Sequence, residues 1–284
     1  MFGRRIALAL GVVTLSIGCG GSRIRTAPTD AVGSIHSARP SVSCFLLFQI
    51  GVGEVRRAPA SGCAARVSPE STFKIPHALA ALDSGVIEGP DTVLPYDGSP
   101  MTFPAWRRDH TLASAMRYSV VWYFQRIADL LGPAREREYL TRFGYGNEDA
   151  SLPQRRFWLD GSLLISPDEQ EHFLVRLYED EGKLPVSEAA IHAVRESLVQ
   201  PPGVIVNAAG EHRFANPWPV DAVVSAKTGS GTGARSGDVR WLVGHVRRGL
   251  QSWVFVSCVT GGRELDPLAA VSLAAKSLHA EQVL

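Results

Sequence analysis

The chain is organised around residues 68–76, which read Ser68-Pro69-Glu70-Ser71-Thr72-Phe73-Lys74-Ile75-Pro76. Serine is a favoured helix N-cap and proline suits the first helical position, so Ser68-Pro69 predicts a helix that begins just before Ser71. The backbone N–H groups of an opening turn have no partner within the helix and favour negative charge. We therefore expect Ser71 in a turn that stabilises an anion.

Lys74 follows Ser71 by three residues, so the two side chains share one face of the predicted helix. A serine hydroxyl becomes an effective nucleophile when a neighbouring base takes its proton. A lysine amine is such a base when apolar neighbours keep it neutral, and Phe73, Ile75 and the pair at 120–121 are candidates for that role. The alternative is an ordinary capped helix with a surface lysine. The chain has four lysines and two of them lie in candidate motifs, which favours the chemical interpretation.

Composition indicates a folded, exported protein rather than a nucleic-acid-binding one. The chain has 284 residues, of which 45% are hydrophobic and 20% charged, with a net charge of +1. This length permits one large core or two lobes, and the near-neutral charge argues against a nucleic-acid partner. We expect no metal site.

Residues 1–19 resemble an export signal. Two arginines precede the apolar run Ile6–Ile17, which is too short to span a membrane. The end of this segment, Leu15–Cys19, also resembles a lipoprotein signal, in which Cys19 would be acylated and become the mature N-terminus; ordinary leader cleavage nearby is the alternative. Residues 20–41 are rich in small and polar residues and predict a flexible tether. We therefore expect a periplasmic protein with a lipid anchor at Cys19.

Two cysteines flank a predicted β-hairpin. A strand that begins at Cys44, a glycine turn at 51–53 and a returning strand bring Cys63 back near Cys44. Because export permits disulfides, we predict a Cys44–Cys63 bridge, which would stabilise the fold by roughly 3 kcal/mol. Two free thiols are the alternative. Cys258, in the apolar run 253–259, is expected to be a buried thiol.

The remaining patterns predict helices in the middle of the chain and strands towards its ends. Helices are expected over 69–84, 111–131, 133–143, 167–181 and 187–199, with a further one from Pro267, and strands over 44–50, 54–58, 204–206, 223–228, 239–246 and 251–259. This order implies an α/β fold with one antiparallel sheet built from both chain ends and flanked by helices, and a helical lobe of about residues 85–200 inserted. Residues 42–284 would form this domain.

A second lysine motif completes a pattern of chemical residues. Lys227-Thr228-Gly229 ends a predicted strand and is followed by Ser230-Gly231. A strand edge without bulky side chains could lie beside the Ser71 helix and offer backbone N–H groups to an oxyanion. Together with Ser119 on a second predicted helix, these residues form the acyl-transfer pattern of penicillin-binding proteins and β-lactamases.

Further motifs select one branch of these proteins. From about Cys44 to its end the chain resembles the class D, oxacillin-type, serine β-lactamases. The resemblance rests on the motifs at residues 68–76, Trp106–His110, Tyr118–Trp122, Tyr145-Gly146-Asn147, Trp158-Leu159 and Lys227-Thr228-Gly229. It implies the penicillin-binding-protein fold and hydrolysis of β-lactam antibiotics through a serine acyl-enzyme.

The resemblance implies a role for each residue of the first motif. Ser71 would be acylated by the β-lactam carbonyl. Lys74 would be carboxylated by CO2, and the resulting carbamate would act as general base for acylation and for the deacylating water. Trp158 would donate a hydrogen bond to that carbamate, and Val121 would keep its pocket dry. No other cofactor is expected.

The resemblance also assigns the second motif. Ser119 would relay a proton to the lactam nitrogen with Lys227 nearby, and the N–H groups of Ser71 and Ser230 would form an oxyanion hole. Thr228, Gly229 and Ser230 would bind substrate. The Tyr-Gly-Asn loop would shape the site rather than act chemically.

Two departures from the family pattern concern the substrate carboxylate. Ser230 stands where many members have an aromatic residue, and the arginine expected early in the C-terminal helix is missing from Pro267–Ala270. We therefore predict that another cation binds the carboxylate, with Arg263 as first choice and Arg235 as second. A solvated Arg263 paired with Glu264 is the alternative.

Two other functions share parts of this pattern. The penicillin-sensor domains of membrane receptors are acylated without turnover, but a sensor is expected to have transmembrane helices in place of a short leader. A D,D-peptidase acting on cell-wall peptide is disfavoured by Ser119-Val120-Val121 and by Trp158-Leu159. We therefore expect an enzyme that turns over β-lactams.

Overall fold

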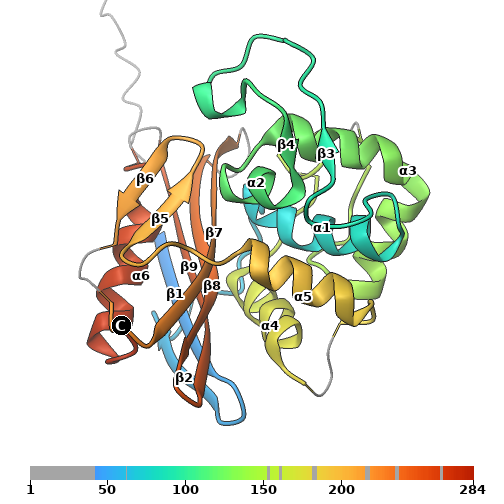
Figure 1. Cartoon of the computed structure of the whole chain (residues 1–284). Helices are drawn as coiled ribbons and strands as arrows, with labels where there is room; N and C mark the ends of the chain where they lie inside the picture. Colours follow the sequence, from blue (N-terminus) through green and yellow to red (C-terminus); the bar gives the residue numbers. More distant parts are fainter. Residues whose placement is uncertain are drawn as a thin grey trace, which may run out of the picture. The chain divides into compact units, whose positions relative to one another are not determined.

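A computed structural model describes residues 42–61, 63–151, 154–159, 162–180, 184–214, 218–233, 237–262 and 265–284 (Figure 1). The predicted leader and tether, with Cys19, lie outside the described residues. The two candidate arginines for the substrate carboxylate, Arg235 and Arg263, lie outside them as well.

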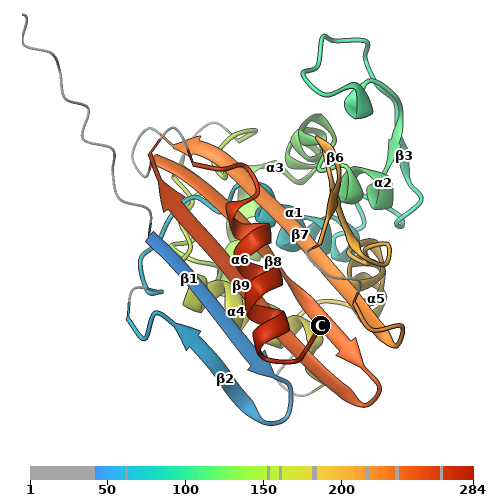
Figure 2. The same cartoon turned by 90° about the vertical axis from the view of Figure 1, so that its left-hand side faces the viewer.

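The central element is a five-stranded antiparallel sheet in the order β2-β1-β9-β8-β7 (Figures 1 and 2). Its strands are β1 (Val42–Gln49), β2 (Gly53–Ala58), β7 (Ala222–Gly233), β8 (Gly237–Arg248) and β9 (Gln251–Gly261). The first hairpin therefore pairs with the last three strands, because β1 lies directly beside β9. The predicted antiparallel sheet built from both chain ends is confirmed.

Side chains alternate between the two faces of the sheet, as the pleat of a β-strand requires. On β8, Trp241 and Val243 join the core beneath the helical lobe, whereas Leu242 joins a second core beneath α6 (Ala269–Ala280). Figure 2 shows α6 lying across this second face. The sheet is thus buried on both sides.

The helical lobe lies on the other face of the sheet (Figure 1). It contains the 3-10 turns η1 (Glu70–Phe73) and η2 (Pro104–Trp106), the helices α1 (Lys74–Asp83), α2 (Leu112–Arg117), α3 (Val121–Phe143), α4 (Pro167–Tyr178) and α5 (Glu188–Ser197), and the strand pair β3 (Val93–Leu94) and β4 (His110–Thr111). A second small pair, β5 (Val204–Asn207) and β6 (Gly210–Arg213), precedes β7. No helix of the described ranges is long and apolar enough to cross a membrane.

The start of α1 differs from the predicted one. Ser68 does not cap a helix; its hydroxyl donates a hydrogen bond of 2.9 Å to the carbonyl of Trp158. Glu70 has a φ of 51°, which interrupts helical backbone, so Ser71 lies in the short turn η1 and α1 begins at Lys74. Ser68 therefore does not act as the predicted N-cap, because its hydroxyl bonds to a residue far along the chain.

The predicted helix over 111–131 is also interrupted. Ser119 has a φ of 54° and separates α2 from α3, so it lies between two helices rather than within one. The predicted boundary at Gly132-Pro133 is present as a break inside α3, where Gly132 has a φ of 75° and a ψ of 160°. At the start of α4, by contrast, Ser166 and Glu169 form the predicted capping box.

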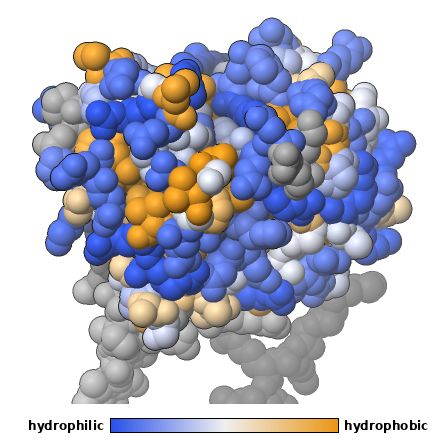
Figure 3. All heavy atoms as spheres, turned by 90° about the horizontal axis from the view of Figure 1, so that it is seen from below, coloured by the Kyte–Doolittle hydropathy of each residue, from blue (hydrophilic) through white to orange (hydrophobic). Residues whose placement is uncertain are grey.

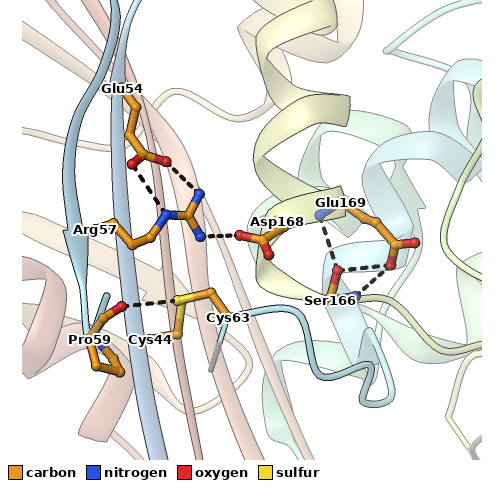
Figure 4. The surroundings of a disulfide bond; sticks show 8 residues. All are labelled: Cys44, Glu54, Arg57, Pro59, Cys63, Ser166, Asp168 and Glu169. Atoms are coloured by element: carbon orange, nitrogen blue, oxygen red, sulfur yellow. Dashed lines mark hydrogen bonds and ion pairs between the residues drawn. A yellow bond between two sulfur atoms is a disulfide. The ribbon is translucent and has the colours of Figure 1, made fainter. Parts of the chain in front are cut away.

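A disulfide joins Cys44 and Cys63, with 5.5 Å between their Cα atoms (Figure 4). Arg57 on β2 pairs with Asp168 at 2.5 Å, and the backbone N–H of Asp168 donates to the carbonyl of Cys63 at 3.3 Å. These contacts connect the first hairpin to the start of α4. Cys258 is a buried free thiol, as expected.

The exposed large hydrophobic side chains lie apart from the two cores. Val52 and Leu250 are 74% and 105% exposed, and they lie in the β1–β2 and β8–β9 turns. The two turns are neighbours, because the N–H of Ile50 donates to the carbonyl of Ser252. The view from below in Figure 3 shows apolar residues gathered within a largely hydrophilic surface.

Candidate active site

Ser71 and Lys74 are in direct contact. Lys74 Nζ lies 2.7 Å from Ser71 Oγ, because η1 runs straight into α1 and keeps residues three apart on one side. The Lys74 side chain has no exposed surface. The predicted pairing of serine and lysine is therefore present at hydrogen-bond distance.

Aromatic side chains pack near the segment that carries Lys74. Its Nζ lies 5.5 Å from the centroid of the Phe124 ring, and Phe73 stacks on Trp158 with 5.5 Å between ring centroids. Burial lowers the pKa of Lys74 to about 7, and the negative charge of Glu70 opposes this effect. A large fraction of an amine with this pKa is in the neutral, proton-accepting form near neutral pH.

Ser119 and Lys227 form a second contact. Lys227 Nζ donates to Ser119 Oγ and to the carbonyl of Thr228, each at 2.9 Å. Burial, and after it the positive charge of Lys74, lower the pKa of Lys227 well below its ordinary value. The two lysines therefore lie close enough to influence each other, and charging one disfavours charging the other.

Strand β7 lies against η1 because it has no bulky side chains there. A Cβ at Gly229 would lie 3.1 Å from the Pro69 carbonyl oxygen, and one at Gly231 would lie 2.1 Å from the Glu70 carboxylate. Ser230 lies between these two glycines, so its backbone belongs to the segment that contacts the turn of Ser71. The glycines on either side of Ser230 therefore allow β7 to approach η1 closely, and the oxyanion hole of the Ser71 and Ser230 N–H groups stays a prediction.

Trp158 packs against Phe73, the neighbour of Lys74 in the chain, and the roles that the resemblance assigns to Trp158 and Val121 stay predictions. Trp158 has no exposed surface, and its Nε1–H has no hydrogen-bond acceptor among the described residues. Val121 is the first residue of α3 and is half-buried, whereas Val120 is fully buried. The unpartnered indole N–H is a donor available to a polar group bound in the pocket.

The Tyr-Gly-Asn loop packs closely against residues 162–164, and its role in shaping the site stays a prediction. Asn147 donates to the carbonyl of Ser162 and accepts from the N–H of Leu164, each at 2.8 Å. Gly146 has a φ of 59°, and a Cβ there would lie 2.1 Å from the Leu164 carbonyl oxygen. Only glycine fits this position.

Sequence reasoning missed two groups next to the serine–lysine pair. Glu70 precedes Ser71 and is 3% exposed, but a carboxylate outside a familiar motif gave no signal. His77 and Glu136 form a buried contact of 2.8 Å between residues 59 apart in the chain. His77 lies one turn after Lys74, and this spacing was the one available sign.

Comparison with known proteins now identifies relatives. Residues 53–279 match the model of the penicillin-binding protein transpeptidase domain. The β-lactamase OXA-48 of Klebsiella pneumoniae is 38% identical over 66% of this chain and 63% of that protein. The solved structure of the class D β-lactamase BAT-2 has a TM-score of 0.73 and 30% identity, over 86% of this chain and 93% of that one.

A relative of another kind also matches. The regulatory protein BlaR1 of Bacillus licheniformis is 33% identical over 74% of this chain and 32% of that protein. The matched part of the chain spans slightly under two thirds of the first curated β-lactamase relatives, at 63 to 65% of their length. The chain is therefore similar to proteins whose names give them more than one role.

Proposed function

The chain belongs to the class D β-lactamases, within the penicillin-binding protein transpeptidase domain family, and we propose from this premise that it hydrolyses β-lactam antibiotics through an acyl-enzyme on Ser71. The observation that carries the proposal is the distance of 2.7 Å between Ser71 Oγ and the fully buried Lys74 Nζ. It provides a nucleophile and a base in the geometry that proton transfer requires.

Acylation begins when the base at Lys74 takes the proton of Ser71. The serine oxygen then attacks the lactam carbonyl carbon, and the carbonyl oxygen becomes negative beside the backbone N–H groups of Ser71 and Ser230. The lactam C–N bond breaks as its nitrogen takes a proton from Ser119. The proton that the base took from Ser71 then replaces the one lost by Ser119, whose hydroxyl is held by the contact of 2.9 Å with Lys227, so the base is free again. In deacylation the base takes a proton from water as the water oxygen attacks the ester carbon, and it gives this proton to the Ser71 oxygen as the ester bond breaks.

We propose further that Lys74 functions after reaction with CO2. The residues present fit a lysine carbamate, because the amine that forms it must be neutral and the pKa of Lys74 is lowered to about 7. Its negative oxygens need a donor, and the buried Nε1–H of Trp158 lacks an acceptor among the described residues. The carbamate would supply the general base for both half-reactions. Val121, at the start of α3, would help exclude bulk water.

Nitrocefin turnover tests the proposed activity. The wild-type protein should hydrolyse many equivalents at a steady rate, and Ser71→Ala should abolish this because the nucleophile is removed. Mass spectrometry after brief exposure to penicillin should place the adduct on the peptide that contains Ser71. Normal turnover by Ser71→Ala, or an adduct on another peptide, would exclude the mechanism.

A penicillin-sensing role is the second candidate, and the similarity to BlaR1 favours it. A sensor is acylated but is not regenerated, so nitrocefin would give a burst of one equivalent and no steady phase. A peptidase acting on cell-wall peptide would give the same burst. Steady turnover therefore supports the lactamase over both.

We also propose that the protein is exported to the periplasm and anchored through acylated Cys19. The disulfide between Cys44 and Cys63 supports an oxidising compartment. Labelled palmitate should enter the wild-type protein and not the Cys19→Ser variant. An unlabelled wild-type protein would contradict the anchor and leave leader cleavage as the mode of export.

A further inference from the structure

A buried polar pair lies behind Lys74. His77 is one turn along α1 from Lys74, and its Nε2 lies 2.8 Å from Oε1 of Glu136 on the second half of α3. The two residues are 1% and 2% exposed. A carboxylate that is removed from water destabilises a fold unless it is well hydrogen bonded, so a buried pair of this kind needs an explanation.

The imidazole of His77 contacts three aromatic side chains, one of which, Phe124, also lies near Lys74 Nζ. Its ring centroid lies 5.0 Å from Phe73, 5.3 Å from Trp158 and 5.9 Å from Phe124. The centroid of the Phe124 ring lies 5.5 Å from Lys74 Nζ. A shift of His77 would therefore disturb both the Phe124 ring near Lys74 Nζ and the indole of Trp158.

Trp158 depends on such contacts for its orientation. It lies in a turn, residues 154–159, and not in a helix or strand. Its carbonyl accepts from Ser68, which fixes its backbone, but its Nε1–H has no acceptor among the described residues. The direction of the indole must therefore come from packing against Phe73, Phe157 and His77.

His77 in turn depends on Glu136. Within the described part of the chain, Nδ1 of His77 has no hydrogen-bond partner, so the contact with Glu136 orients the ring. Glu136 reaches it because Gly132 breaks α3 and redirects the helix that carries Glu136. The chain of contacts runs from Glu136 to His77 and from His77 to Trp158.

We propose that His77 and Glu136 are positioning residues for the lysine base: Glu136 orients His77, and His77 holds Trp158 so that its Nε1–H faces the carbamate on Lys74. This inference rests on the proposed function. Neither residue takes part in the reaction itself. Their loss should weaken the carbamate and slow turnover at low bicarbonate, and abundant bicarbonate should restore it.

The affinity of Lys74 for CO2 can be measured without substrate. The protein is titrated with ¹³C-labelled bicarbonate, and the carbamate carbon is followed by ¹³C NMR, with Lys74→Ala to identify the signal. Glu136→Gln keeps the volume of the side chain but weakens the contact. The double variant His77→Leu with Glu136→Leu removes both polar partners, which avoids a buried unpaired carboxylate and keeps the protein folded.

The double variant should need about tenfold more bicarbonate for half-saturation, comparable to the loss of an outer-shell partner of a metal ligand. Glu136→Gln should also raise the bicarbonate concentration needed for half-saturation, but by a smaller factor. His245→Asn is the matched control. His245 is also a buried histidine with a polar contact, at 2.5 Å from Ser252, but its ring stacks on Tyr178 and not on Trp158. It should lower the melting temperature and leave the titration unchanged.

Two results would overturn the proposal in different ways. If both pair variants titrate like the wild type, the positioning role is wrong and the proposed function is unaffected. If the wild-type protein shows no Lys74-dependent signal, the carbamate is wrong and the positioning role fails with it. A shift of equal size in His245→Asn would mean that the variants report general loosening of the fold.

Discussion

At the scale of single residues, the chemistry depends on a lysine that the fold holds in an unfavourable place. Burial of Lys74 removes water from its ammonium form, which lowers the pKa of the amine to about 7. The unfolded chain carries the same lysine with an ordinary pKa of about 10.4. The property that makes Lys74 a base therefore destabilises the folded state, a conflict common at active sites.

We predict that Lys74→Met raises the stability of the protein in CO2-free buffer. Above pH 10.5 both states hold a neutral amine, so the wild type carries no penalty there. As the pH falls, the unfolded lysine binds a proton and the folded one does not until about pH 7. The gain from methionine should therefore grow as the pH falls towards 7 and reach roughly 3–5 kcal/mol, since each unit of the pKa difference corresponds to about 1.4 kcal/mol.

Denaturant unfolding at pH 7 and pH 10 measures this difference. Lys276→Met is the control, because Lys276 lies exposed on α6. Its effect should be small and independent of pH. A Lys74→Met gain that is equal at both pH values would mean that burial does not perturb this lysine.

At the scale of elements, the contact between β7 and η1 brings the two lysine motifs together. Trp241 on β8 donates to the carbonyl of Ser68 at 2.9 Å, which fixes η1 to the sheet. Gly229 meets three firm neighbours, each 3.1 Å from where its Cβ would be: the Pro69 carbonyl oxygen, Thr72 and Trp241. The distance between Ser71 and the strand is therefore set by a glycine.

We predict that Gly229→Ala lowers kcat/KM by about tenfold or more with little change in secondary structure. The added methyl would push β7 away from η1 by a few tenths of an ångström, and catalysis is sensitive to such displacements. Circular dichroism and nitrocefin kinetics measure the two quantities. Gly89→Ala serves as control, because no atom lies within 4 Å of its Cβ position. An unchanged rate would show that the contact does not set the catalytic geometry.

The elements differ in how far they could be predicted from sequence. The capping box of α4 was predicted correctly because both its residues lie within one turn of the chain. Ser68 was misassigned because the partner of its hydroxyl, Trp158, is 90 residues away. The break at Ser119 was missed because the flanking apolar residues keep a helical spacing, and periodicity does not report a single positive φ.

The candidate site was predicted better than the fold around it. Ser71 with Lys74 and Ser119 with Lys227 were paired from their motifs, and both contacts are present. The contact of Glu136 with His77 could not be predicted, because no motif joins residues on two helices that pack only in the folded chain. Arg235 and Arg263 lie outside the described residues, so the cation for the substrate carboxylate stays a prediction.

At the scale of the whole domain, the sheet is assembled from strands that come from opposite ends of the sequence. β1 pairs with β9 from Val42 with Thr260 to Gln49 with Trp253, so the first hairpin is an edge addition to the last three strands. Pairing across such a sequence distance carries an entropic cost of loop closure. The disulfide and the contact of Arg57 with Asp168 connect that edge to α4 and so help to hold the first hairpin in place.

We predict that the double variant Cys44→Ala with Cys63→Ala loses about 2–4 kcal/mol of stability and keeps its kcat. The bridge closes a segment with a sequence separation of 19, and its removal frees the unfolded chain without touching Ser71 or Lys74. Chemical unfolding with and without dithiothreitol measures the loss, since the reduced wild type should unfold like the double variant. Cys258→Ala is the control, because the buried thiol of Cys258 forms no disulfide. Dithiothreitol should destabilise this variant by as much as it destabilises the wild type. A lowered kcat in the double variant would contradict this prediction and would mean that the edge hairpin helps to place the nucleophile. The disulfide would then contribute to the geometry of the active site as well as to the stability of the domain.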